Sequence, residues 1–267
     1  MSNFFNRRRL VVFLHPHRVC HDKKIQLVQR RKKILLLTKP FSSKKKIAEI
    51  YFSSSSSIAN LKHYGTAIYL NSSSVLSTTL TVTNSFAWSA ALASYIRGLN
   101  AAMGILSFSS GCIANIQNSN TLYLLDVVLE NYGNIMINSS TLQFFGSANQ
   151  TIFINEAGGT IDAVGTTNEF NAYTGTSSFN NYGLIRINGS SSSSTFTITV
   201  PFDNNGTVAP TSGEIYLDSN GIHSGTFDPS AGSIIFIGGT NTLTTASTVL
   251  NGTGITFSGT KSAEIRL

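Results

Sequence analysis

Short runs of alternating apolar and polar residues recur along the second half of the chain, and each follows a glycine. Gly133-Asn-Ile-Met-Ile137 and Gly183-Leu-Ile-Arg-Ile187 are clear examples. The set begins at Gly133, Gly159, Gly183, Gly206, Gly232 and Gly254, which are spaced 22–26 residues apart. Alternation with a period of two predicts half-buried β-strands. Self-similarity at a nearly fixed spacing predicts a solenoid with one supersecondary unit per repeat.

Each repeat holds two further strand-like segments. One follows the glycine strand, and its copies are Thr141–Phe145, Thr195–Val200, Glu214–Leu217 and Thr242–Thr244. The other is an apolar residue followed by Asn, Asp or Glu just before the next glycine: Leu129-Glu130, Ile154-Asn155, Phe179-Asn180, Phe202-Asp203, Phe227-Asp228 and Leu250-Asn251. Three short strands per coil of about 22–26 residues predict an all-β fold, a right-handed parallel β-helix, or β-solenoid.

We assign the solenoid to residues 59–267, with its clearest repeats at 104–257, after a basic, low-complexity and disordered segment at 1–58. Gly104–Phe108 is interpreted as an early, weaker copy of the glycine strand. Residues 89–103 leave two alternatives open, a short helix or a degenerate coil, and the surrounding strand repeats favour the coil. Ser53–Ser57 is a serine run of the kind that forms a flexible joint.

Strand alternation also predicts which side chains point inwards. The expected interior residues are Ile135, Ile137, Ile161, Ala163, Ile185, Ile187, Val208, Ile234 and Phe236. The expected outward residues are Asn134, Thr160, Asp162, Arg186, Thr207 and Ser233. Three apolar residues, Met136, Leu184 and Ile235, also fall on the outer side, and they suggest a buried or adhesive lateral strip.

The repeated glycines are expected at corners of the coil, either because the backbone needs a positive φ or because another backbone comes close. The Asn and Asp residues before them suit turns, since their side chains hydrogen-bond locally. Stacked coil on coil, such asparagines can also form amide ladders.

Charge divides the chain into two parts. Residues 1–50 carry fourteen Lys and Arg against two acidic residues, whereas residues 51–267 carry five basic and ten acidic residues. The net charge of +7 therefore describes a tail, and we expect no nucleic-acid partner for the solenoid. The tail resembles neither a complete secretory signal nor a spanning helix, and no transmembrane helix is predicted. A disordered tail, an artefactual extension, a transit peptide, and attraction to nucleic acid or anionic membrane all remain alternatives for it.

A family resemblance follows from several runs: Leu80–Trp88, Phe179-Asn-Asn-Tyr-Gly183, Phe202–Val208, Ser224–Phe227 and Gly238–Leu243. Together they resemble the repetitive, low-charge β-solenoid regions of bacterial adhesins and haemagglutinin-like surface proteins, over roughly residues 65–260. The resemblance implies a structural or adhesive role and an extracellular or cell-surface location, and it brings no active site.

Parallel β-helices also house polysaccharide lyases and hydrolases, which need converging carboxylates, basic residues or a metal. Asp162 and Arg186 are expected to be neighbours on successive outer strands and to form an ion pair. Asp203 and Asp228 occupy one repeat position and are interpreted as turn residues. His223, between two glycines, is interpreted as a turn or surface histidine. Cys20 and Cys112 give no disulfide framework or metal spacing, so no cofactor, metal site or catalytic residue is predicted.

Six Asn-x-Ser/Thr sequons are candidate N-glycosylation sites: Asn71, Asn138, Asn149, Asn188, Asn205 and Asn251. The leading functional hypothesis is a non-enzymatic extracellular module whose polar Ser/Thr/Asn face contacts glycans or surface proteins, with lateral or end-to-end self-association as a further option. The alternatives are a carbohydrate-active β-helix enzyme with a degenerate or incomplete site, and a fragment of a larger repeat protein.

Overall fold

The structure is a computed structural model that describes residues 10–11, 25–27, 34–35, 49–63, 67–71, 77–89, 93–99, 103–117, 121–147, 149–189, 191–229, 231–244, 249–250, 253–258 and 264–266. Every regular element within these residues is a β-strand. The described part of the chain accordingly contains no helix that is long and apolar enough to cross a membrane.

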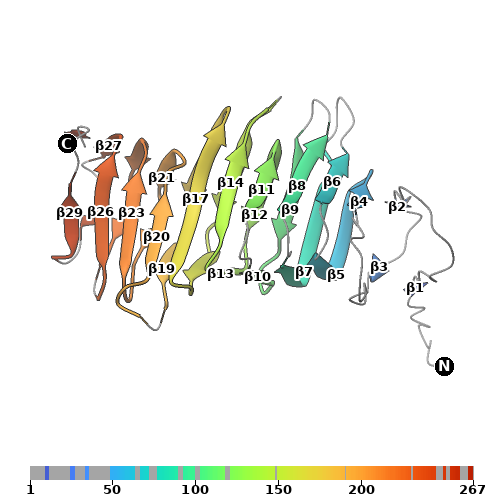
Figure 1. Cartoon of the computed structure of the whole chain (residues 1–267), viewed down its shortest axis with the longest axis horizontal. Helices are drawn as coiled ribbons and strands as arrows, with labels where there is room; N and C mark the ends of the chain where they lie inside the picture. The colour runs from blue at the N-terminus through green and yellow to red at the C-terminus, as the bar shows by residue number, and fades with distance from the viewer. Residues whose placement is uncertain are drawn as a thin grey trace, which may run out of the picture.

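The strands stack side by side into a rod, and the chain advances along it from one end to the other (Figure 1). Each coil contributes one strand to each of three faces, and successive coils pair in parallel on all of them. The chain is therefore an all-β parallel β-solenoid with three short strands per coil, as the repeats predict. A separate two-stranded sheet pairs β1 (Leu10–Val11) with β3 (Ile34–Leu35).

Face 1 is an eleven-stranded sheet. Its strands are β2 (Ile25–Leu27), β4 (Glu49–Phe52), β6 (Ala67–Asn71), β8 (Ser94–Leu99), β11 (Leu122–Leu125), β14 (Thr141–Phe145), β17 (Thr167–Thr174), β20 (Thr195–Ile198), β23 (Glu214–Asp218), β26 (Ser233–Gly238) and β29 (Ile255–Phe257).

Faces 2 and 3 belong to one 17-stranded sheet that turns a corner. Face 2 holds β5 (Ser56–His63), β7 (Thr79–Trp88), β9 (Gly104–Phe108), β12 (Val127–Asn131), β15 (Thr151–Asn155), β18 (Ser177–Asn181), β21 (Phe202–Asn204), β24 (Gly221–His223), β27 (Thr240–Leu243) and β30 (Glu264–Arg266). Face 3 begins with the second halves of β5 and β7 and continues as β10 (Ile113–Gln117), β13 (Asn134–Asn138), β16 (Thr160–Ala163), β19 (Leu184–Ile187), β22 (Thr207–Val208), β25 (Thr226–Phe227) and β28 (Val249–Leu250).

Inward-pointing side chains form one continuous core that runs from Ile50 to Leu243. All nine residues expected in the interior are fully buried, which confirms the assignment of the interior positions. Aromatic rings stack along the axis. On face 2 the ring centroids of Phe153 and Phe179 lie 5.0 Å apart, and those of Phe179 and Phe202 lie 5.0 Å apart. Offset or tilted rings at this distance stabilise the stack beyond the burial of their area.

The register corrects the predicted set of equivalent glycines. Four of them directly precede face 3 strands: Gly133, Gly159, Gly183 and Gly206. Gly232 and Gly254 instead precede β26 and β29 of face 1, so their equivalence with the other four is wrong. The true successor of Gly206 is Gly225, before β25. The coil between Asn204 and His223 is only 19 residues long, so a glycine from a different corner falls within the expected spacing.

Two further strand assignments also change. Gly104–Phe108 forms β9 on face 2, and the first counterpart of the glycine strands is β10, which follows Cys112. Thr242–Thr244 overlaps β27 on face 2 rather than a face 1 strand. Two face 1 strands, β11 and β17, were not predicted; in β17 the buried Asn168 hides the apolar alternation.

Close backbone approach, rather than a positive φ, explains the six repeat glycines. The described glycines with positive φ are Gly111, Gly158, Gly175, Gly213 and Gly239, none of them in that set. A Cβ added at Gly183 would lie 2.2 Å from the carbonyl oxygen of Gly159, and one added at Gly206 would lie 2.2 Å from that of Gly183. The coils therefore stack at this corner at a distance that admits no side chain on the glycine.

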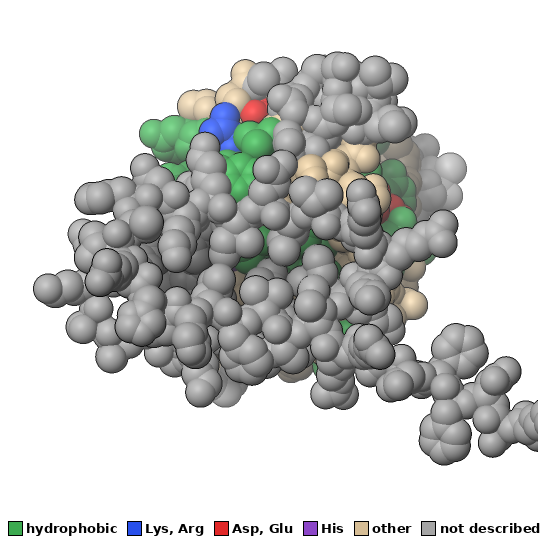
Figure 2. Space-filling view, turned by 90° about the vertical axis from the view of Figure 1, so that its right-hand side faces the viewer, with side chains coloured by type: hydrophobic (Ala, Val, Ile, Leu, Met, Phe, Trp, Pro, Cys, Tyr) green, Lys and Arg blue, Asp and Glu red, His purple; other side chains and the backbone are tan. Residues whose placement is uncertain are grey.

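The described solenoid includes strands upstream of residue 59. Ile50 and Phe52 of β4 and Ile58 of β5 are buried in the core; the first three residues of the serine run connect the two strands, and its last two begin β5. Most of residues 1–48, including the basic clusters and Cys20, lie outside the described residues, so the disorder expected there stays a prediction. In the view onto this end, the described side chains that show are mostly hydrophobic or uncharged (Figure 2).

The coil reading of residues 89–103 is confirmed by β8, which pairs with β6 and β11. The expected apolar strip is wrong. Met136 adjoins Asp162 in the register, Leu184 lies between Thr160 and Thr207, and Ile235 belongs to face 1. These three half-buried side chains therefore lie in different rows of the surface.

Candidate functional site

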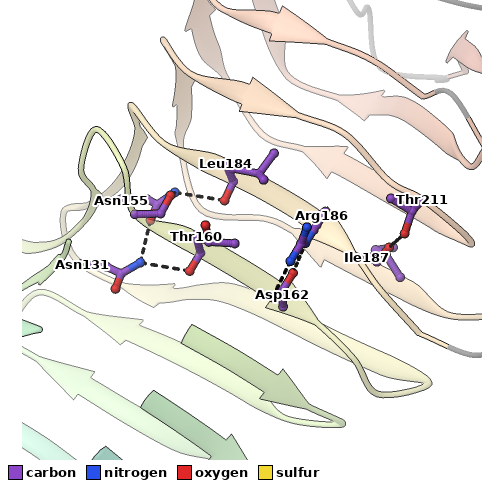
Figure 3. A network of polar contacts seen from close by, with 9 residues as sticks. Asn131, Asn155, Thr160, Asp162, Leu184, Arg186, Ile187 and Thr211 are labelled. Atoms are coloured by element: carbon purple, nitrogen blue, oxygen red, sulfur yellow. Dashed lines mark hydrogen bonds and ion pairs between the residues drawn. The ribbon is translucent and has the colours of Figure 1, made fainter. Parts of the chain in front are cut away.

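A ladder of buried asparagine side chains marks the corner between faces 2 and 3 (Figure 3). Its members end four successive face 2 strands: Asn131, Asn155, Asn181 and Asn204. The side-chain nitrogen of each donates to the side-chain oxygen of the next, at 2.7, 2.8 and 2.7 Å. All four residues are fully buried. The prediction that asparagine side chains form a ladder between coils is thus confirmed.

The positions of the ladder differ from the expected ones. Of the expected positions, Asn155 is a ladder member. The other expected positions, Glu130, Asn180 and Asp203, each lie one residue before the residue that forms the ladder. Face 2 strands place Phe179 inside, Asn180 outside and Asn181 inside, so alternation alone selects the second asparagine. The ladder amides also bond to the adjoining backbone. Asn155 Nδ2 lies 3.3 Å from the Leu184 oxygen, and Asn131 Nδ2 lies 3.1 Å from the Thr160 oxygen.

His223 takes the place of asparagine in the next coil. It pairs with Asn204 in the register, and its Nδ1 accepts a hydrogen bond from the Asn204 backbone N–H at 3.2 Å. Its Nε2 lies 2.9 Å from Asn241 Oδ1, and its ring is fully buried against Phe202, Phe227 and Phe236. Burial lowers the pKa of His223 below its usual range. The expected surface position is therefore wrong, and the ring is a corner residue inside the core.

The expected ion pair between Asp162 and Arg186 is confirmed. The two residues are register neighbours on β16 and β19, and the guanidinium binds the carboxylate through Nε and through Nη2, the latter at 3.1 Å (Figure 3). The carboxylate side chain is only 6% exposed and the arginine side chain 35%. The hydrogen bond to Asp162 raises the pKa of Arg186, so the guanidinium keeps its charge. Its charges are engaged with each other.

The other titratable candidates do not converge. Asp203 lies on face 2, where its carboxylate accepts from the Ile222 N–H at 2.7 Å, while Asp228 follows β25 on face 3. Their predicted equivalence is wrong. Burial raises the pKa of the Cys112 thiol to about 11. Within the described ranges, no three His, Cys, Asp or Glu side chains are grouped closely enough to hold a metal ion.

An aromatic row lies on the outer side of face 1, which the sequence reading did not identify. Its members, on four successive strands, are Tyr95, Tyr123, Phe145 and Tyr173. Successive ring centroids are 4.7, 5.5 and 4.5 Å apart. Tyr173 is 61% exposed. The signal available in the sequence was an aromatic residue at an outward position of each strand, which becomes visible only when β8, β11 and β17 are recognised.

A shallow concavity of about 390 Å³ lies on the glycine corner of the rod. It is lined by Gly158, Gly159, Thr160, Tyr182, Gly183, Leu184, Gly206 and Thr207, and we call it the glycine-corner trough. Thr160, Leu184 and Thr207 are register neighbours in its floor, and Tyr182 is 48% exposed beside them. Three of its lining residues, Gly159, Gly183 and Gly206, are the corner glycines whose Cβ positions face the backbone of the coil below. None of its lining residues carries a charge.

The candidate glycosylation sites differ in exposure. Asn188 and Asn205 are exposed, and Asn138 and Asn149 are half-buried. The side chain of Asn71 and the whole of Asn251 lie outside the described residues. Glycosylation at these sequons stays a prediction.

The chain was compared with known protein families, curated proteins and solved structures. A scan against protein-family models finds no match, and searches of curated proteins and of solved structures find no similar protein. The candidate functional features of the described residues are therefore two uncharged surfaces of the solenoid, the aromatic row and the glycine-corner trough.

Proposed function

We propose that the chain is a non-enzymatic structural or adhesive module that contacts glycans or other proteins at an extracellular or cell surface. The aromatic row carries this proposal. Its rings recur at the spacing of the coils, so a chain molecule lying along the rod meets one ring after another. Tyrosine combines an apolar ring with a polar hydroxyl, which suits surfaces that bind and still face water. The resemblance to adhesin-like solenoids points the same way.

The outer surface supports contact rather than chemistry. Asp162 and Arg186 neutralise each other, Asp203 caps a backbone N–H of the next coil, and Asp228 lies on another face. Glycosidase chemistry requires two carboxyl groups that flank one bond. A carbohydrate-active enzyme is the second class of function, and a direct assay separates the two.

The test measures adhesion of protein-coated beads to surfaces that carry polysaccharides or matrix proteins. We expect Tyr173→Ala and Tyr123→Ala to weaken binding by about fivefold or more, since aromatic anchors dominate contact energies. Tyr216→Ala is the matched control, because Tyr216 lies on the same face, outside the row, and its hydroxyl is bonded to Glu214. Equal adhesion of all three variants and the unmodified chain would remove the observation on which the proposal rests.

Catalysis is tested by incubating the chain with polysaccharides and measuring new reducing ends and unsaturated products. We expect none above background. Turnover that disappears in Asp203→Asn or Asp228→Asn would establish the enzyme class and overturn the non-enzymatic proposal.

A further inference from the structure

The glycine-corner trough differs from the aromatic row in position and in chemistry. It lies over β16, β19 and β22 of face 3, whereas the row lies on face 1. Its floor is a Thr–Leu–Thr row that crosses three coils, with a tyrosine at its edge. This combination offers an apolar centre with hydroxyl groups on both sides.

Two backbone carbonyl groups of the trough are already paired. The carbonyl oxygen of Gly159 accepts from the Leu184 N–H at 2.9 Å, and that of Gly183 accepts from the Thr207 N–H at 2.8 Å. Recognition in the trough therefore belongs to the side chains of Thr160, Tyr182, Leu184 and Thr207. A tyrosine ring and a leucine side chain suit the apolar face of a ring-shaped ligand, and two threonine hydroxyls suit its polar edge.

Electrostatics select the charge of the ligand. The described residues include four Lys and Arg, at positions 62, 97, 186 and 266; none of them lines the trough, and Arg186 is engaged by Asp162. The charged residue that directly precedes the trough is acidic, Glu156, which lies two residues before Gly158. A carboxylate-bearing sugar would thus enter a site with no free cation in its lining and an acidic neighbour, and desolvating its charge there costs free energy that nothing offsets.

We propose that the glycine-corner trough binds a neutral pyranose residue of a glycan, with Tyr182 and Leu184 against the ring face and Thr160 and Thr207 on its hydroxyls. This inference rests on the proposed contact function and adds the ligand class and the site. Uronic-acid polymers are excluded as preferred ligands. The glycines at 159, 183 and 206 set the stacking of the coils beneath the trough, since a side chain at any of them would meet the backbone of the coil below.

Tyr132 provides a matched control for Tyr182. Both residues lie between a ladder asparagine and a corner glycine, in Asn131-Tyr132-Gly133 and Asn181-Tyr182-Gly183. Both are exposed, 41% and 48% respectively. Tyr132 is outside the trough, and its hydroxyl lies 3.5 Å from Glu156. A difference in affinity between alanine variants of the two tyrosines therefore reports binding in the trough, because both tyrosines share the Asn-Tyr-Gly motif.

The experiment titrates the full chain by calorimetry with neutral hexasaccharides (cellohexaose, laminarihexaose, mannohexaose and chitohexaose) and with hexagalacturonate. We expect one or more neutral ligands to bind, with affinity reduced about tenfold or more in Tyr182→Ala, largely kept in Tyr182→Phe, and unchanged in Tyr132→Ala. Thermal unfolding of each variant checks that the fold is intact.

Several outcomes overturn the inference. Hexagalacturonate binding as tightly as the best neutral ligand, or equal binding by the unmodified chain and Tyr182→Ala, removes the trough as a neutral-sugar site. Absence of binding to every oligosaccharide does the same. The proposed contact function is judged separately, because its test uses the aromatic-row variants, which leave the trough unchanged.

Discussion

The side-chain nitrogen of Asn155 donates to the side-chain oxygen of Asn181 in the next coil at 2.8 Å, and both residues are fully buried. Each of these asparagines is at once a donor to the coil above and an acceptor from the coil below. Buried hydrogen-bond chains of this kind strengthen one another, and an interruption leaves polar groups without partners on both sides.

The ladder predicts a large difference between two adjacent asparagines. Asn181→Ala removes the acceptor of Asn155 and the donor to Asn204, and we expect it to lower the free energy of unfolding by about 2–4 kcal/mol. Asn180→Ala, half-buried on the outer side, should change it by less than about 0.5 kcal/mol. Chemical denaturation of both variants measures this, and similar losses at the two positions would contradict a special role for the ladder.

Two neighbouring glycines are predicted to resist substitution for different reasons. Gly183→Ala places a Cβ 2.2 Å from one backbone oxygen and 2.6 Å from another, and we expect a loss of about 3 kcal/mol or more, because backbone must move. Gly158 has a φ of +88° and open space around its Cβ position. Gly158→Ala should cost about 1–2 kcal/mol.

Asparagine distinguishes these two causes, because it tolerates a positive φ better than alanine does. Gly158→Asn should be more stable than Gly158→Ala, whereas Gly183→Asn should be at least as unstable as Gly183→Ala. The reverse order at either position, in thermal unfolding, would show that the assigned cause is wrong.

Two buried histidines predict acid sensitivity. Burial lowers the pKa of His63 from 6.5 to about 4, where its Nε2 lies 2.9 Å from Ser94 Oγ, and burial also lowers the pKa of His223. The folded chain therefore holds neutral imidazoles, while the unfolded chain takes up protons as the pH falls below about 6.5. The stability gained from the neutral rings is complete above that pH and is lost as the pH falls towards 4. For His63 alone the loss is about 3 kcal/mol.

The measurement is the free energy of unfolding at several pH values between 7 and 4.5. His223→Asn places the ladder residue of the lower coils at this corner and should flatten the pH dependence without unfolding the chain. His63→Gln should flatten it separately, since the two residues lie in distant coils and their effects should add. An unchanged slope in both variants would assign the acid sensitivity to the carboxylates.

The Asp162–Arg186 pair predicts a modest and salt-dependent coupling. Arg186 is about a third exposed, so solvent screens part of the attraction, and we expect a coupling free energy of about 1 kcal/mol in a double-mutant cycle of Asp162→Ala and Arg186→Ala. The coupling should shrink in 1 M salt. A coupling free energy near zero at low salt would mean that the ion pair does not stabilise the fold.

Local alternation predicted more of this fold than the repeat count did. Ile135, Ile161 and Ile185 were assigned correctly because every second residue of a strand points inwards. Gly232 was misassigned because the coils differ in length, so spacing along the chain does not identify equivalent positions. After the 19-residue coil, the glycines at the expected spacing lie at another corner. Register between strands is a property of hydrogen bonding across coils, which spacing along the chain does not encode.

The surface features were harder to predict for a related reason. Tyr182 and Leu184 are far from Thr160 and Thr207 along the chain. Only the stacking of β16, β19 and β22 brings these residues together. Tyr95 and Tyr173 likewise join one row through face 1 strands, β8 and β17, which the glycine motif does not mark. His223 was misassigned because its turn glycines suggested exposure, although it occupies an inward position of β24.

The asparagine corner also sets how the rod responds to a pulling force. Hydrogen bonds between coils lie along the rod axis, so the interfaces between coils bear an axial load in series and the coils detach one after another. A coil that detaches at one end releases between 19 and 26 residues of chain, as counted between ladder positions, and each residue extends by up to about 3.5 Å. The remaining coils keep their own ladder bonds, so the rod behaves as a tether that lengthens in steps while its intact part continues to hold.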